Sequence, residues 1–291
     1  MGQAGAVSTA SASVRQDGFP RWVRAILELV LILGLWVLYS LARLLADTSM
    51  GPALKRANDL LHIERLIGIH WEAPINRVFT DHRVIGLLGS YWYATLHYVV
   101  TLGVLAWLWR LGADRYGPAR RALVISTLLG LIMYISMPTA PPRFIGGYVD
   151  VLSLHSADGW WGADASAPRG LGGLTNELAA FPSLHAGWAL WVALALQLYA
   201  TRKWVRVLGW AYAIGTAVVI IGTGNHWVID AVMGWVVVLV GWVAATAIGR
   251  IPLPVPWQRR TSSGSPSGSP SGSPSATPGD APAREDATVV D

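Results

Sequence analysis

The chain has no cysteine and few charged residues. The absence of Cys from its 291 residues excludes disulfides, thiolate metal sites and a cysteine nucleophile. Only 13% of the residues are charged, whereas a soluble domain carries about a quarter. Phenylalanine is also scarce, with four Phe against 16 Trp. Because the Trp ring suits the membrane–water interface, these shortages together indicate a membrane protein.

The net charge of +5 is modest, and no single basic patch accounts for it. Lys and Arg residues lie in short clusters between hydrophobic runs, which is the pattern of membrane topology. A nucleic-acid-binding protein would concentrate them on one face or one helix. We therefore expect no nucleic-acid partner.

Six hydrophobic runs approach or reach the roughly 17–25 residues that a transmembrane helix needs. The first is too long for a signal-peptide core and has no small-residue cleavage site after it. We predict an all-α fold, a polytopic membrane helix bundle with about six transmembrane helices over residues 21–250. The runs cover residues 22–45, 85–109, 122–137, 183–200, 205–222 and 226–248.

Four segments outside these runs have distinct compositions. Residues 1–20 are small and polar, and residues 251–291 are rich in Ser, Gly and Pro, so we predict that both are disordered. Residues 46–83 are mixed and predict an amphipathic segment in the membrane interface. Residues 138–182 form a long Gly- and Pro-rich loop. The expected apolar face of the interfacial segment consists of Leu54, Ala57, Leu61 and Ile67.

The basic clusters predict the orientation of the bundle. Cytoplasmic ends of spans carry an excess of Lys and Arg. With six spans, four clusters fall on one side, so we predict that this side and both termini are cytoplasmic. The basic residues of segment 46–83 fall on the opposite side, together with five acidic residues. The four clusters are Arg15, Arg21 and Arg24; Arg110, Arg115, Arg120 and Arg121; Arg202, Lys203 and Arg206; and Arg250, Arg259 and Arg260.

The outer side contains a histidine and an aspartate at the start of the last run. His226 and Asp230 are four residues apart and share one face of a helix. A carboxylate that accepts from one imidazole nitrogen leaves the other nitrogen free as nucleophile or base. Asn225 is the expected N-cap of this helix. The N–H groups of its first turn would then form an anion site.

Two further motifs are predicted on the same side. Pro182 and Ser183 predict a helix start, which places His185 in the first turn and gives Ser183 as a hydroxyl donor. Prolines before Arg143 end the third run, and its guanidinium suits two phosphate oxygens. One histidine can then attack phosphorus while the other protonates the leaving oxygen. This set of residues requires no metal or other cofactor.

At these motifs the chain resembles the type 2 phosphatidic acid phosphatase (PAP2) superfamily. That family has an Arg-Pro motif, a Pro-Ser-Gly-His motif and a third motif ending in His, three residues and Asp. Residues 182–185 (Pro-Ser-Leu-His) are similar to the second motif, and Arg143 matches the Arg of the first. The resemblance implies a six-helix membrane core, His226 as the phosphohistidine nucleophile, Asp230 as its partner and His185 as the proton donor.

Some positions differ from the family pattern. Ile220 stands where the third motif has Arg, Ser136 where the first has Lys, and Phe144 where Pro follows Arg. Arg43, near the outer end of the first run, is a candidate replacement for a phosphate ligand. The other interpretation of Arg43 is an interfacial side chain that snorkels to the membrane surface. His97, inside the second run, is either a buried donor to a backbone carbonyl or a proton or head-group contact.

The motif variants look like the inositol phosphorylceramide synthase-like branch, whose members transfer a phosphoinositol head group. Segments 64–68 and 93–97 also look like that branch, and the match covers about residues 35–248. The resemblance implies an integral membrane lipid phosphotransferase or phosphatase at the outer face, with phosphoinositol-type transfer as the first hypothesis. Its partners would be a membrane lipid substrate and a lipid or alcohol acceptor.

Two alternatives remain open. One is a lipid phosphate phosphatase for phosphatidic acid or a polyprenyl diphosphate. The other is a non-catalytic protein that binds or transports a lipid phosphate, as the two missing cations suggest. Intact His185, His226 and Asp230 favour an enzyme over the second alternative.

Overall fold

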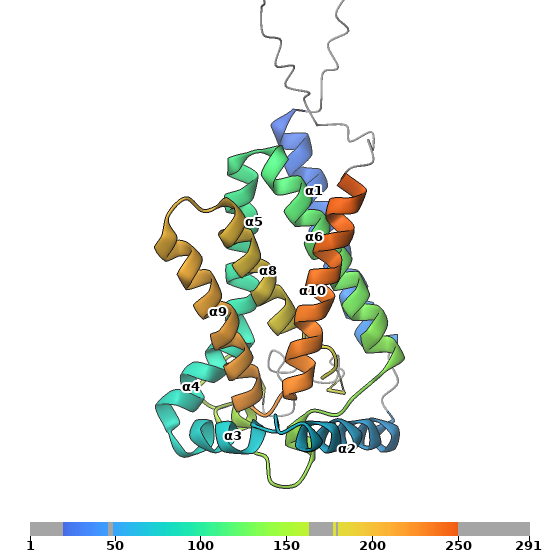
Figure 1. Ribbon diagram of the computed structural model, residues 1–291, viewed down its shortest axis with the longest axis vertical. Helices are drawn as coiled ribbons and strands as arrows, with labels where there is room; N and C mark the ends of the chain where they lie inside the picture. The colour runs from blue at the N-terminus through green and yellow to red at the C-terminus, as the bar shows by residue number, and fades with distance from the viewer. Residues whose placement is uncertain (1–19, 46–48, 163–176, 179, 250–291) are drawn as a thin grey trace, which may run out of the picture. The chain divides into compact units, whose positions relative to one another are not determined.

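The computed structural model describes residues 20–45, 49–162, 177–178 and 180–249. Every regular element in these ranges is helical (Figure 1). The segments predicted to be disordered lie outside them, except Pro20. The elements are α1 (Arg21–Leu45), α2 (Met50–Leu66), α3 (Glu72–Asp81), α4 (Arg83–Tyr91), a π-helical turn (Trp92–Leu96), α5 (His97–Leu111), α6 (Ala113–Ser136), a 3-10 turn (Pro142–Phe144), α7 (Val151–Leu154), α8 (Leu184–Tyr199), α9 (Lys203–Gly222) and α10 (Val228–Gly249).

Four stretches of the described chain are long and apolar enough to cross a membrane. They are the continuous helix Arg83–Leu111, α6, α9 and Val228–Ile248 of α10. Helix α8 is also apolar but has only 16 residues, and α1 has 25. The predicted all-α membrane fold is therefore confirmed, while the count of six spans stays a prediction.

Helix α6 begins nine residues before the run predicted at 122–137, so that boundary was wrong. The hydrophobic pattern missed the first turns of α6 because they contain Arg residues. In those turns, two polar side chains have a partner in Glu28 of α1. Its carboxylate pairs with the Arg120 guanidinium and accepts a hydrogen bond of 2.9 Å from the Tyr116 hydroxyl. Glu28 itself is buried.

Helices α2 and α3 run across the ends of the long helices (Figure 1). α2 contacts α10, and α3 contacts α9. The buried face of α2 consists of Ala53, Ala57, Leu61 and Glu64. The predicted face was correct at Ala57 and Leu61, in part at Leu54, which is half-buried against the same cluster, and wrong at Ile67. Ile67 follows the last residue of α2 and is 60% exposed. On this buried face, the acidic side chain of Glu64 lies where an apolar side chain would be expected.

The beginning of α8 lies very close to α10. A Cβ atom at Gly234 would lie 2.2 Å from the Ser183 carbonyl oxygen, and one at Gly187 would lie 3.1 Å from the Gly234 oxygen. Small residues allow such close backbone contact between membrane helices. The crossing brings the start of α8 against the first turns of α10.

We predict that Glu28→Ala weakens the attachment of α1 to α6. The change leaves the largely buried Arg120 guanidinium without its carboxylate, which costs roughly 3–5 kcal/mol. The measurement is thermal unfolding of the purified protein in detergent. Asp114→Ala, which removes an exposed carboxylate at the start of α6, is the control. Equal unfolding temperatures for the two variants would contradict the prediction.

Candidate active site

The three sequence motifs meet at the ends of α8, α9 and α10. The backbone N–H of Ser183 donates to the Asp230 carbonyl oxygen at 2.9 Å, and the backbone N–H of Arg143 donates to the Gly224 carbonyl oxygen at 3.0 Å. Gly224 has a φ of +75°, and a Cβ there would lie 2.7 Å from the Val149 carbonyl oxygen. Glycine therefore permits both the turn and the close approach. The motifs are joined through their backbones.

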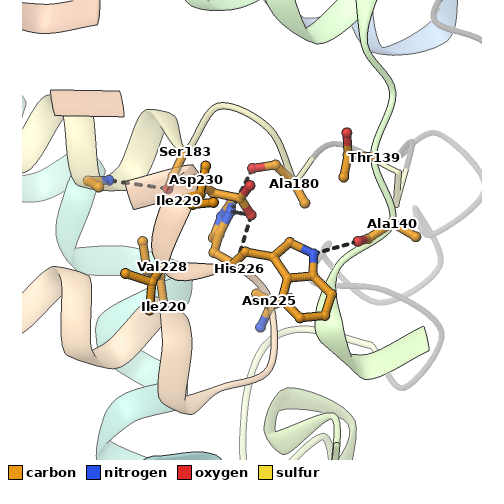
Figure 2. A network of polar contacts seen from close by, with 12 residues as sticks. Thr139, Ala140, Ala180, Ser183, Ile220, Asn225, His226, Val228, Ile229 and Asp230 are labelled. Carbon is orange, nitrogen blue, oxygen red and sulfur yellow. Dashed lines mark hydrogen bonds and ion pairs between the residues drawn. The ribbon is translucent and has the colours of Figure 1, made fainter. Parts of the chain in front are cut away.

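His226 lies at the centre of this arrangement (Figure 2). Its Nδ1 atom lies 2.8 Å from the carbonyl oxygen of Ala180, which can only accept a hydrogen bond. The proton is therefore on Nδ1, and Nε2 has a lone pair. Nε2 is buried and has no hydrogen-bond partner among the described residues. The ring therefore has a nucleophilic nitrogen that makes no hydrogen bond with the described residues.

Burial keeps His226 neutral. Loss of solvent lowers the pKa of this imidazole to about 3, because the charged form is poorly solvated inside the protein. The hydrogen bond to Ala180 acts in the opposite direction, and the nearby positive charge of Arg143 lowers the pKa further. At neutral pH the lone pair on Nε2 is not blocked by a proton.

Asp230 lies beside His226, as its spacing predicted, but it also accepts a hydrogen bond from the backbone. Its Oδ2 atom is 3.5 Å from His226 Nδ1 and accepts a shorter hydrogen bond, 2.7 Å, from the backbone N–H of Trp227. The carbonyl of Ala180 is thus the nearer acceptor for the imidazole. The fully buried carboxyl group lies beside the ring and accepts from the N–H of the residue that immediately precedes α10.

The first turn of α10 is not a free anion site, and that prediction was wrong. Three consecutive N–H groups there already have carboxylate partners. Trp227 donates to Asp230, Val228 donates to Glu72 Oε1 at 2.8 Å, and Ile229 donates to Glu64 Oε1 at 2.8 Å. Sequence reasoning missed both glutamates. The available signal was the position of Glu64 on the apolar face of α2.

Asn225 does not cap α10 either. Its amide nitrogen donates to the carbonyl oxygen and hydroxyl of Thr223, at 3.3 Å and 3.1 Å. Its amide oxygen accepts from the Arg143 guanidinium. The expected N-cap is therefore a buried link between the turn after α9 and Arg143.

The helix start predicted at Pro182 and Ser183 is confirmed, and Ser183 caps α8. Its hydroxyl oxygen accepts from the backbone N–H of Ala186 at 3.3 Å, and the residue is fully buried. The next residue but one, His185, then lies in the first turn of the helix. The cap and the close contact at Gly234 together fix the position of His185 in the first turn of α8.

The ring of His185 lies among other aromatic rings. Its centroid is 5.7 Å from that of His226, 4.3 Å from the stacked ring of Tyr93 and 4.1 Å from that of His97. His97 Nδ1 also lies 3.0 Å from the Tyr93 carbonyl oxygen. The first interpretation of His97, a buried donor to a backbone carbonyl, is therefore confirmed. A proton or head-group contact stays a prediction, and the ring contacts His185. The π-helical turn just before it changes the helix register, as such turns often do near functional sites.

The Arg143 guanidinium is close to His226 but already has partners. It donates to Asn225, its Nε lies 3.3 Å from Asp150 Oδ2, and its Nη2 lies 3.7 Å from Glu177 Oε1. Its side chain is only 8% exposed. A phosphate group would therefore exchange places with a carboxylate. Arg43 belongs to α1, but its side chain lies outside the described residues.

The comparisons with known proteins concern this same region. No curated protein matches the chain. Among solved structures, the crystal structure of Aquifex aeolicus LpxE is similar, with a TM-score of 0.43 and 15% sequence identity over 60% of this chain and 93% of that chain. A family model described as PAP2 superfamily matches residues 58–244, well over half of the sequence, including all three motifs. The chain therefore belongs to the PAP2 superfamily.

Proposed function

We propose that this protein is an integral membrane enzyme that cleaves a lipid phosphate ester through a covalent intermediate on His226. The observation that supports this most is the Nε2 atom of that ring, which is neutral, buried and without a partner among the described residues. A histidine that served only to hold the structure would be expected to use both nitrogens. The next imidazole, His185, faces it across 5.7 Å.

In the first step, the lone pair of His226 Nε2 attacks phosphorus. The bond from phosphorus to the lipid or head-group oxygen breaks, and protonated His185 gives its proton to that oxygen. The phosphorylated ring becomes an imidazolium with its remaining proton on Nδ1. The carbonyl of Ala180 and the carboxylate of Asp230 stabilise that charge.

In the second step, an acceptor oxygen attacks the same phosphorus. His185 removes the proton from water or from an alcohol, the bond from phosphorus to Nε2 breaks, and His226 regains its lone pair. Both residues return to their starting states. Water as acceptor makes the enzyme a phosphatase, and an alcohol makes it a phosphotransferase.

The phosphate oxygens are proposed to bind Arg143, assisted by Ser183 and Asn225. Arg143 provides the positive charge, and Asn225 fixes its guanidinium. Asp150 and Glu177 hold that guanidinium until the phosphate replaces one of them. Arg43 is a further candidate ligand, since the chain has no Lys at 136 and no Arg at 220.

Hydrolysis of a lipid phosphate is the function that family membership supports most directly. Transfer of a phosphoinositol-type head group is the finer proposal, and the motif variants from Arg143 to Asn225 favour it. The two reactions differ in one product. Release of inorganic phosphate or a phosphorylated head group into water indicates the phosphatase, whereas a new phosphodiester with an added lipid alcohol indicates the transferase.

We propose that the site faces the outside of the cell membrane and that both termini are cytoplasmic. Because the chain has no Cys, single cysteines report cleanly on this topology. A membrane-impermeant maleimide should label Leu154→Cys in intact cells, and Thr201→Cys only after lysis. Both positions are exposed. Labelling of the second variant in intact cells would contradict the orientation.

For His226→Ala, we expect turnover of p-nitrophenyl phosphate and of lipid phosphates to fall roughly 10⁴-fold or more, because no nucleophile remains. An acid-labile phosphoenzyme should be trapped from the wild type and not from the variant. His62→Ala, which removes an exposed histidine of α2, is the matched control. Undiminished turnover in a folded His226→Ala protein would rule out the mechanism.

For His185→Ala, we expect the loss to depend on the leaving group. Cleavage of a lipid phosphate should fall about 10²–10⁴-fold, because its alkoxide needs a proton to depart. The burst of p-nitrophenolate from p-nitrophenyl phosphate should fall much less, because that anion leaves without one. The measurement compares the two first-step rates in purified protein. An equal loss for both substrates would show that His185 is not the proton donor.

A further inference from the structure

Helix α10, which follows His226 and contains Asp230, begins beside two buried acids from distant parts of the chain. Glu64 belongs to α2 and Glu72 to α3, and both are at most 1% exposed. Each acid accepts one hydrogen bond of 2.8 Å from a backbone N–H of α10. Glu64 accepts from Ile229, and Glu72 accepts from Val228. We call Glu64 and Glu72 the acid pair. Its hydrogen bonds fall two and three residues after His226.

The second carboxyl oxygen of each acid is also buried. Neither remaining oxygen, Oε2 of Glu64 or Oε2 of Glu72, has a partner in the rest of the described chain. Burial and the contact with Glu72 raise the pKa of Glu64 to about 9. Glu64 is therefore protonated at neutral pH, so the pair has at most one negative charge. That charge suits the positive end of the α10 dipole.

Two further groups interact with the acid pair. Asp230 of α10 adds a negative charge that opposes ionisation of Glu64. Tyr148, from the segment after the 3-10 turn, interacts with both acids and packs edge-on against Trp227 at a centroid distance of 5.8 Å. A second negative charge on the pair would thus lie near the charges of Glu72 and Asp230. A proton on Glu64 prevents this.

We propose that Glu64 and Glu72 are positioning residues, whose single shared proton lets them hold the first turn of α10 and so aim His226 Nε2 at the substrate phosphate. The inference rests on the function proposed above, since it assigns His226 the reacting atom. A capping serine could satisfy one N–H group without a charge. Two acids accept hydrogen bonds from two adjacent N–H groups of α10 and so link the position of His226 to α2 and α3.

The first test compares Glu64→Gln with Glu64→Ala. Glutamine keeps an oxygen for the Ile229 N–H and an amide donor for Glu72, so it imitates the protonated acid. We expect kcat for p-nitrophenyl phosphate to stay close to wild type in Glu64→Gln. In Glu64→Ala it should fall about 100-fold with little change in KM, because the reacting nitrogen is misplaced. Asp59→Asn, at an exposed position of α2, is the matched control.

The second test follows unfolding temperature against pH and needs no substrate. A folded-state pKa of about 9, raised from 4.5, means that folded Glu64 keeps a proton that the unfolded chain loses above pH 4.5. Its contribution to stability is complete below pH 4.5 and declines as pH rises to about 9. Glu64→Gln has no such proton, so the wild type should lose stability relative to it across that range.

The outcomes separate the two proposals. Wild-type kcat in a folded Glu64→Ala protein, or an equal loss of kcat in the Gln and Ala variants, would overturn the positioning role. Parallel pH curves for wild type and Glu64→Gln would overturn the shared proton. If the wild type cleaves no phosphate ester at all, the proposed function fails, and the pH comparison alone then decides whether the acid pair holds its proton.

Discussion

A helix that begins inside a protein must find partners for the N–H groups of its first turn. At the start of α10 those partners are carboxylates, from Asp230 within the helix and from Glu64 and Glu72 outside it. Because an unpaired buried N–H costs free energy comparable to a lost hydrogen bond, this arrangement ties α2 and α3 to the bundle. The proposed positioning of His226 rests on the same contacts.

The second constraint comes from backbone proximity. Gly234 allows Ser183 to donate its N–H to the Asp230 carbonyl, so the two histidine-bearing helices are joined at their reacting ends. Each histidine is therefore held by a helix start whose cap is itself buried. Rigid placement of this kind matters more for phosphoryl transfer than special acid–base strength, since catalysis there depends largely on positioning and charge.

Sequence reasoning recovered the parts with a local signature. Long apolar runs predicted the bundle, the Pro-Ser pair predicted the start of α8, and the four-residue spacing placed Asp230 beside His226. It failed where the partner is distant or has no side-chain signature. The acceptor of His226 is a backbone carbonyl at Ala180, and the acids at α10 lie more than 150 residues away in the chain. Arg120 concealed the first turns of α6 for the same reason, since its partner Glu28 is in another helix.

The Arg143 guanidinium forms ion pairs with two acidic side chains, Asp150 and Glu177. Under the proposed function, a phosphate that replaces one of them would gain only the difference between two similar contacts, so free phosphate in water would bind weakly. A lipid confined to the bilayer would be present at a high local concentration and would tolerate such weak binding. Such a site would select its substrate by location, and a phosphate-bearing product that reaches water would leave.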